Sequence, residues 1–280
     1  MSKNKIFEIL FKTTGRTIIL LVLILPVTLI YYSKSYVNSF DFLTILFEDW
    51  KPSQEQFGLR AFIFTTLMMG FFSTIIAFLI SFSTAVFIYF NEGSFLGKFI
   101  YNLIRLMSGI PTVVYGLAGL MLIVPIIRKY TVSPSGLSIF TVIIVLSVLL
   151  LPTITIYLLN GFKLVPNSLK TAALSLGSNE VQLFFKVLIP QTKSNILISL
   201  AMGFTRAVGD TIIALMVSGN SFRFPISLYQ SARNITSQIA LLIPGEFTGV
   251  EFSSIFFLAV ILISIVIIID LLIIFVDKRK

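Results

Sequence analysis

Residues 17–33 read TIILLVLILPVTLIYYS, an apolar run long enough to cross a membrane as a helix. A spanning helix needs roughly 20 mostly apolar residues, because the hydrocarbon core of a bilayer is about 30 Å thick. Five further stretches meet the same requirement, at residues 62–90, 99–127, 138–160, 196–219 and 253–276. The sequence therefore predicts an all-α, polytopic membrane protein with six transmembrane helices.

The composition also indicates a lipid environment. Of the 280 residues, 56% are hydrophobic and only 12% are charged. A soluble domain of this size cannot bury so much apolar surface, because its surface is too large relative to its volume. The chain has no cysteine and no histidine, which removes the commonest metal ligands and proton shuttles. No nucleophile–base pair stands out, so we expect no catalytic residue, no metal site and no cofactor.

The basic residues are divided unequally between the two sides of the predicted spans. With the N-terminus inside the cell, 13 of the 21 lysines and arginines are cytoplasmic, seven are outside, and one, Arg206, lies within a span. Cytoplasmic loops carry such an excess, so both termini are predicted to be cytoplasmic. The chain then divides into a cytoplasmic tail (1–16), a six-helix membrane domain (17–276) and a second cytoplasmic tail (277–280). No basic patch is interleaved with aromatic residues, so nucleic-acid binding is not expected.

Two predicted outer segments are longer than simple connections. Residues 34–60 carry four acidic side chains, and residues 220–252 carry Pro225, Pro244 and Gly245. Either segment docks an extracytoplasmic partner, or both are ordinary loops that join spans. The residues alone leave these two interpretations open.

The cytoplasmic segment between the fourth and fifth spans, residues 161–195, predicts a helical hairpin. Pro166 suits the first turn of a helix over residues 167–176, where its missing N–H is not needed. Gly177 suits the left-handed position that ends such a helix. Either Ser178 or Asn179 can then cap a second helix.

The second helix of this hairpin is expected to end at Pro190. Its predicted apolar side consists of Val181, Phe184, Phe185 and Leu188. A helix–glycine–helix hairpin has the right shape to sit in a groove of another protein. The alternative is a pair of amphipathic helices that lie on lipid headgroups.

Span five contains GFTRAVGDT at residues 203–211, which places Arg206 and Asp210 one helical turn apart on one face. Arg206 is predicted to lie near the membrane midplane, roughly 15 Å deep at about 1.5 Å per residue. A charged residue at this depth normally faces the bundle interior or a water-filled path. Its guanidinium matches the geometry of an oxyanion such as phosphate, and Asp210 can balance its charge in the empty site. The alternative is a structural salt bridge within the core.

Span three contains SGIPTVVYGLAG at residues 108–119. Pro111 is expected to free a backbone carbonyl near Met107 and to interrupt the helix. Ser108, Thr112 and Tyr115 add hydroxyl groups at helical spacing. An interrupted helix is tolerated in a membrane where it lines protein or water, so this stretch either borders the transport path or forms a packing kink.

The hairpin resembles the Glu-Ala-Ala loop of bacterial ABC importer permeases, on Thr171, Ala172, Ala173, Gly177, Val187, Ile189 and Pro190. The resemblance implies a type I importer permease fold in which this loop couples the membrane domain to an ATP-hydrolysing subunit. Thr171 stands where that family usually has glutamate. The chain has no Gly-x-x-x-x-Gly-Lys-Ser/Thr motif, so a partner is expected to hydrolyse ATP.

RAVGDT at residues 206–211 is similar to the Arg-Ala-Ile/Val-Gly-Glu-Thr signature of phosphate-specific importer permeases, with Asp210 in place of glutamate. SGIPTVVYGLAG is typical of the same permeases, and residues 216–220 are nearer to their C-type subunit. The resemblance implies transport of inorganic phosphate across the bacterial cytoplasmic membrane and a role for Arg206 and Asp210. It also implies three partners: a homologous A-type permease subunit, two copies of an ATP-binding subunit, and an extracytoplasmic phosphate-binding protein.

Two other functions are compatible with these residues. One is a permease of the same fold for another oxyanion, such as tungstate or molybdate, because Arg206 alone does not distinguish among oxyanions. The other is a secondary anion transporter that needs no ATPase.

Overall fold

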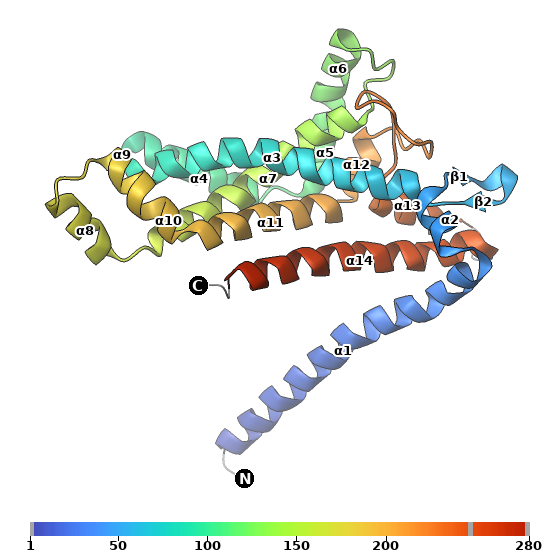
Figure 1. Cartoon of the computed structure of the whole chain (residues 1–280), viewed down its shortest axis with the longest axis horizontal. Coiled ribbons are helices and arrows are strands. Elements are labelled where there is room, and N and C mark those ends of the chain that lie inside the picture. The colour runs from blue at the N-terminus through green and yellow to red at the C-terminus, as the bar shows by residue number, and fades with distance from the viewer. Residues whose placement is uncertain (1–2, 246–248, 278–280) are drawn as a thin grey trace.

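The computed structural model describes residues 3–245 and 249–277, which are mostly helical (Figure 1). In chain order, the helices are α1 (Lys3–Ser39), α2 (Phe42–Phe47), α3 (Arg60–Phe90), α4 (Phe95–Ser108), α5 (Thr112–Ala118), α6 (Val124–Tyr130), α7 (Ile139–Lys163), α8 (Asn167–Ser175), α9 (Glu180–Leu183), α10 (Ile189–Gln191), α11 (Lys193–Gly209), α12 (Ile212–Val217), α13 (Ile235–Leu242) and α14 (Gly249–Asp277). Strands β1 (Trp50–Lys51) and β2 (Gln56–Phe57) form an antiparallel hairpin. Two π-helical segments connect α5 to α6 (Gly119–Ile123) and α9 to α10 (Phe184–Leu188).

Five helical segments of the described residues are long and apolar enough to cross a membrane, and they match the first, second, third, fourth and sixth predicted spans. They are Leu10–Ser39, Arg60–Phe90, Thr112–Tyr130, Ile139–Lys163 and Gly249–Ile273. The prediction of a continuous fifth span over 196–219 is wrong, because α11 ends at Gly209 and α12 begins at Ile212. The predicted stretch is instead covered by two helices with a break between them.

The third predicted span, 99–127, is interrupted as well. α4 ends at Ser108, and α5 begins after Pro111, whose backbone is extended (φ −59°, ψ 143°). Proline has no N–H to continue the helical ladder and disfavours a helical conformation in the residue before it. The apolar crossing segment therefore covers 112–130, and α4 is a separate helix that packs against α3 and α7.

Helices α3, α7, α11 and α14 lie side by side along the long axis of the molecule (Figure 1). α7 is the most buried of the five spanning segments and contacts both α3 and α11. α1 contacts α14 but diverges from the bundle toward its own N-terminal end, where its apolar side chains are exposed. The core of the molecule therefore forms around α7, and α1 lies outside it.

Hydroxyl groups hold α3 and α7 together. Ser81 Oγ donates a hydrogen bond to the carbonyl of Leu151 at 3.1 Å, and Ser147 Oγ donates to the carbonyl of Ser73 at 3.2 Å. Small hydroxyl residues allow helices to approach closely in a membrane, where no hydrophobic effect drives helices together. These contacts position α7, which carries part of the site described below.

The loop between α12 and α13 covers the N-terminal end of α7. The N–H groups of Ile139 and Phe140 donate to the carbonyls of Gln230 and Leu228, at 3.1 and 2.8 Å. The first N–H groups of a helix have no partner within the helix, so this loop supplies partners that the α7 sequence lacks. The two segments are thereby held in one arrangement.

The two ends of the bundle differ in character (Figure 1). At one end, β1, β2 and α2 pack around an aromatic cluster that includes Tyr36, Trp50 and Phe62. At the other end, α8, α9 and α10 form the predicted hairpin, and α1 begins and α14 ends on the same side. The elements expected to meet different partners therefore lie at opposite ends of the molecule.

Candidate functional site

Arg206 lies near the C-terminal end of α11 and faces α7. Its Nη1 donates a hydrogen bond to the hydroxyl of Thr153 at 2.6 Å, and the residue is half-buried. Gly203, one turn earlier, allows this approach: a Cβ there would stand 2.7 Å from the Cδ1 atom of Ile154 on α7. The contact between α11 and α7 therefore depends on a glycine and places the guanidinium against a neutral partner.

Asp210 ends α11 and caps α12. Its backbone is extended (φ −73°, ψ 127°), and its Oδ1 accepts a hydrogen bond from the N–H of Ile213 at 2.8 Å. Its own carbonyl accepts from the hydroxyl of Thr236 on α13, also at 2.8 Å. Asp210 is only 9% exposed. One aspartate thus joins three helices at the point where the predicted fifth span breaks.

The prediction that Arg206 and Asp210 share one helical face is wrong, because the helix ends between them. Among the described residues, the two side chains form no ion pair. Arg206 hydrogen bonds to Thr153 of α7, and Asp210 hydrogen bonds to the N–H of Ile213 in α12. The break therefore gives the two side chains separate partners.

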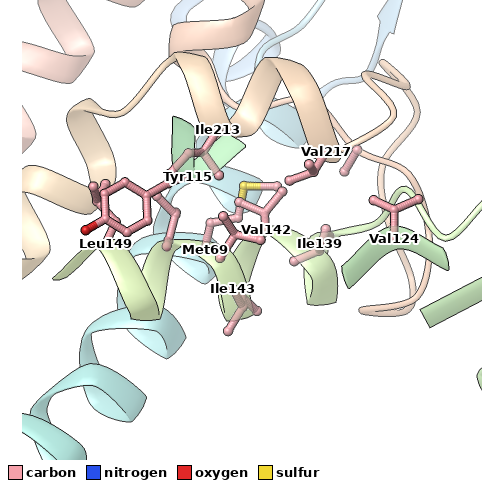
Figure 2. Close-up of a cluster of buried hydrophobic side chains, with 12 residues drawn as sticks. Met69, Tyr115, Val124, Ile139, Val142, Ile143, Leu149, Ile213 and Val217 are labelled. Carbon is pink, nitrogen blue, oxygen red and sulfur yellow. The ribbon is translucent and has the colours of Figure 1, made fainter. Parts of the chain in front are cut away.

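Tyr115 provides a second donor for the Met107 carbonyl, which Pro111 was expected to free and which also accepts from the Ile110 N–H at 3.3 Å. Its hydroxyl donates to the Met107 carbonyl at 2.8 Å and so bridges the break between α4 and α5. The ring belongs to a buried apolar cluster with Met69, Val142 and Ile213. Figure 2 shows the ring beside Ile213, with the hydroxyl pointing away from Met69 and Val142.

The three predicted hydroxyl residues of this stretch do not share one helical face. Ser108 is the last residue of α4 and is exposed, and its hydroxyl donates to the carbonyl of Arg105 at 2.7 Å. Thr112 begins α5 and is half-buried. Of the three, only Tyr115 is buried, so the Pro111 break disperses the predicted set.

A close contact between α5 and α12 brings Tyr115 to the Asp210 region. A Cβ on Gly116 would stand 2.6 Å from the Sδ atom of Met216 and 3.7 Å from the Cα atom of Ile213. Tyr115 thereby lies on a helix that packs against α12, the helix that Asp210 caps. Within the described residues, no group of three Asp, Glu, Cys or His side chains is placed to hold a metal ion.

Sequence reasoning missed Thr153 and Thr236, both of which contact the predicted pair. Thr153 follows Pro152 inside α7, where it is a hydroxyl residue in a strongly apolar run. Thr236 belongs to α13, a helix in a segment that was predicted as an outer loop. The signal for Thr153 was present in the sequence, whereas the position of Thr236 depends on how α13 folds back.

The first helix of the hairpin, α8, agrees with the prediction. Pro166 precedes it as the N-cap residue, and Gly177 follows it with a φ of +81°. Thr171 and Ala172 are exposed, Ala173 is half-buried, and the Thr171 hydroxyl donates to the carbonyl of Asn167 at 3.0 Å. The left-handed turn predicted at Gly177 is therefore confirmed.

The second helix of the hairpin begins as predicted. Asn179 caps α9 through a reciprocal pair: its Oδ1 accepts from the Gln182 N–H at 2.8 Å, and Gln182 Oε1 accepts from the Asn179 N–H at 3.2 Å. Of the two candidate caps, Asn179 is thus the one used, and Ser178 donates to the carbonyl of Ala173 instead.

The predicted apolar side of this second helix is partly wrong. Phe184 and Leu188 are buried, but Val181 and Phe185 are 63% and 61% exposed, and Leu183 is buried in their place. The π-helical segment Phe184–Leu188 adds a residue to the turn and rotates the faces before and after it relative to each other. Val187 and Ile189 are half-buried, and Pro190 is exposed in α10, which ends at Gln191.

The exposed surface of the hairpin is rich in apolar side chains. Leu169, Leu174 and Leu176 are 42%, 51% and 88% exposed on or beside α8, and no residue of α8 is buried. Apolar side chains gathered on a projecting element mark a contact surface. The geometry agrees with an element that another protein covers.

Comparison with known proteins agrees with this arrangement. The family described as binding-protein-dependent transport system inner membrane component matches residues 77–280. The phosphate transport system permease protein PstC of Pasteurella multocida is 30% identical over 260 residues, covering 85% of this chain and 81% of that protein. PstC of Haemophilus influenzae is also 30% identical, covering 83% and 81%. The probable ABC transporter permease YqgH of Bacillus subtilis is 33% identical, covering 73% and 66%.

Solved structures show the same fold. The MetNI methionine ABC transporter, in an inward-facing conformation, matches with a TM-score of 0.64 at 17% identity, covering 82% of this chain and 98% of that one. A bacterial alginate ABC transporter matches with a TM-score of 0.67 at 16% identity, covering 98% and 96%. The predicted all-α, type I importer fold is confirmed. This multi-pass membrane protein belongs to the family of binding-protein-dependent transport system inner membrane components.

Proposed function

We propose that this chain is the C-type permease subunit of an ATP-driven importer that moves inorganic phosphate across the bacterial cytoplasmic membrane. The observation that carries this proposal is Arg206, a half-buried arginine inside the membrane domain whose hydrogen-bond partner is the neutral Thr153. The similarity to PstC proteins over more than four fifths of the chain supports phosphate as the anion.

Arg206 contacts the anion in this proposal. A guanidinium offers a planar fork of donors that fits two oxygens of a tetrahedral oxyanion, and a charged acceptor makes a stronger hydrogen bond than a hydroxyl. An arriving phosphate can therefore displace Thr153 from Arg206. Phosphate at neutral pH also carries a P–OH group, which can donate a hydrogen bond to the carboxylate of Asp210.

The break between α11 and α12 supports a transport path at this point. A membrane interior accepts irregular backbone only where protein or water satisfies its polar groups. Asp210 and Thr236 satisfy part of this break through the Ile213 N–H and the Asp210 carbonyl. Broken helices at substrate sites are a recurrent device of transporters, and the helix that follows the Pro111 break, α5, packs against α12.

The coupling element in this proposal is the loop 161–195, in which α8 enters a groove of the ATP-binding subunit. Two copies of that subunit would serve a heterodimer of this chain with a homologous A-type permease. Both termini then lie in the cytoplasm with the hairpin. The opposite end, with β1 and β2, faces an extracytoplasmic phosphate-binding protein.

Uptake of radiolabelled phosphate in cells tests the proposal. A bacterial strain that lacks its own phosphate importers would receive this chain with its A-type permease, ATP-binding subunit and binding protein. We expect uptake that unlabelled phosphate suppresses and that equal concentrations of sulfate, molybdate and tungstate leave unchanged. Absence of labelled phosphate uptake, together with uptake of molybdate or tungstate by the same cells, would replace phosphate with another oxyanion.

A further inference from the structure

A second arginine, Arg233, occupies the neck of the loop between α12 and α13. The loop closes where Gly219 pairs with Ala232, and Arg233 Nε donates to the carbonyl of Asn220 at 3.0 Å across this closure. Arg233 Nη1 donates to Oε1 of Gln238 on α13 at 2.7 Å. Its Nη2 donates to no residue in the part of the chain that the structure describes.

The charge of Arg233 has no carboxylate partner among the described residues. Its two acceptors are neutral, although the side chain is half-buried, and desolvation by burial lowers the pKa of its guanidinium. Arg60, by contrast, reaches Oδ1 of Asp49 at 2.9 Å. A partly buried charge without a counter-ion costs folding free energy. An anion bound beside Arg233 would offset this cost.

Gln238 adds an unpaired donor beside Arg233. An arginine N–H can only donate, so the amide oxygen of Gln238 faces Arg233 and the Nε2 group faces elsewhere. Gln238 is 0% exposed, and its Nε2 has no hydrogen-bond partner among the described residues. The same is true of the hydroxyl of the adjacent Ser237, which is also 0% exposed. Buried polar atoms are nearly always paired in native proteins, so these two groups are available to bind a ligand.

Arg233 and Gln238 are connected to Asp210 through α13. Thr236, which lies between Arg233 and Gln238 in the sequence, donates its hydroxyl to the Asp210 carbonyl. Asp210 in turn caps α12 through the N–H of Ile213, and it follows Arg206 by one turn in the sequence. Arg206 lies one turn before this junction on α11, and Arg233 lies three residues before Thr236; neither arginine has a carboxylate partner among the described residues.

We propose that Arg233, with Gln238, forms an outer oxyanion contact that receives the anion released by the binding protein and passes it to Arg206. The proposal rests on the proposed function, since it takes phosphate as the anion and the α13 side as the outer side. With two such contacts in series, the anion can enter without a single deep site that binds it too tightly for release.

The test compares Arg233→Gln with Arg223→Gln in the complete importer reconstituted in proteoliposomes. Arg223 is a matched control, because it is an exposed arginine of the same loop and its loss changes the charge equally. We expect Arg233→Gln to lower phosphate uptake about tenfold, while ATP hydrolysis stimulated by the loaded binding protein persists. Arg223→Gln should transport like the unchanged protein. Equal uptake by the two variants would overturn the proposal.

Arg233→Lys separates an anion contact from a purely structural role, because lysine keeps the charge and loses the two directed hydrogen bonds. Partial recovery of uptake supports the proposal. An assembled Arg233→Lys complex as inactive as Arg233→Gln would assign Arg233 to holding the loop and would overturn the proposal.

If the unchanged importer moves molybdate or tungstate and not phosphate, the proposed function fails, and the same comparison with that anion still decides the role of Arg233. Transport of no oxyanion contradicts both.

Discussion

Arg206 of α11 hydrogen bonds to Thr153 of α7 at 2.6 Å, and its acidic neighbour in the sequence, Asp210, takes no part in this contact. The arginine thus has a neutral partner within the membrane domain, and the aspartate is committed to the cap of α12. A hydroxyl is easily exchanged for an anion, whereas a bound carboxylate would have to be displaced at a larger cost. The arrangement favours an arginine that binds substrate over one that only stabilises the fold.

Replacing Arg206 by alanine should abolish phosphate uptake while the protein still inserts and assembles. The half-buried guanidinium hydrogen bonds to the neutral Thr153, so its removal breaks no ion pair among the described residues. Uptake and co-purification with the partner subunits measure the two properties separately. Arg223→Ala, at an exposed arginine, is the control. Full uptake by Arg206→Ala would refute the assigned role.

Replacing Asp210 by asparagine should separate the cap from the charge. Asparagine caps a helix as well as aspartate does, so the melting temperature of the complex should change by less than about 2 °C. Uptake should fall about tenfold, because the charge that balances Arg206 is lost. Asp210→Ala should lower both, since a lost cap costs about 1 kcal/mol. Normal uptake by Asp210→Asn would reduce Asp210 to a structural cap.

Replacing Tyr115 by phenylalanine should loosen the break between α4 and α5. The ring stays in the core, but the Met107 carbonyl loses the shorter of its two hydrogen bonds, at a cost of about 1 kcal/mol, and keeps only the bond from the Ile110 N–H. We expect a lower melting temperature and a smaller loss of uptake than with Arg206→Ala. Tyr130→Phe serves as the control, because Tyr130 is 73% exposed. Identical melting of the two variants would show that the bridge to Met107 does not stabilise the fold.

Replacing Gly177 by valine should uncouple the permease from its ATPase. Gly177 has a φ of +81° and open space around its Cβ position, so the substitution acts through backbone strain of about 1–2 kcal/mol and not through a clash. Gly93→Val is a matched control: its Cβ position is equally open, and its φ is outside the left-handed range. Co-purification of the ATPase should fall for Gly177→Val alone. Equal retention would contradict a coupling role for this turn.

Local sequence signals predicted the hairpin well and the interrupted spans less well. Gly177 acts through its own turn, so its position followed from the residues alone, and Asn179 was one of the two residues predicted as the cap of α9. The exposed positions of Val181 and Phe185 did not, because a π-helical segment changes the register and has no simple sequence signature. A helical wheel drawn through Phe184–Leu188 therefore gives the wrong face.

The candidate site shows the same limit on a larger scale. The charge pattern identified Arg206 and Asp210, but hydropathy could not reveal that an aspartate inside an apolar run ends one helix and caps the next. The sequence predicted that Pro111 frees a backbone carbonyl near Met107. It did not predict that the hydroxyl of Tyr115, four residues beyond the proline, donates to this carbonyl. Thr236 reaches Asp210 only because α13 folds back, a tertiary relationship that periodicity does not contain.

The most direct test of phosphate import driven by ATP is uptake into proteoliposomes that contain the whole importer, with ATP inside and phosphate-loaded binding protein outside. The comparison is between the intact ATP-binding subunit and a variant whose nucleotide site is destroyed. We predict phosphate accumulation with the intact subunit and none with the variant. Equal accumulation in both would contradict the account and would identify the chain as a transporter that needs no ATPase.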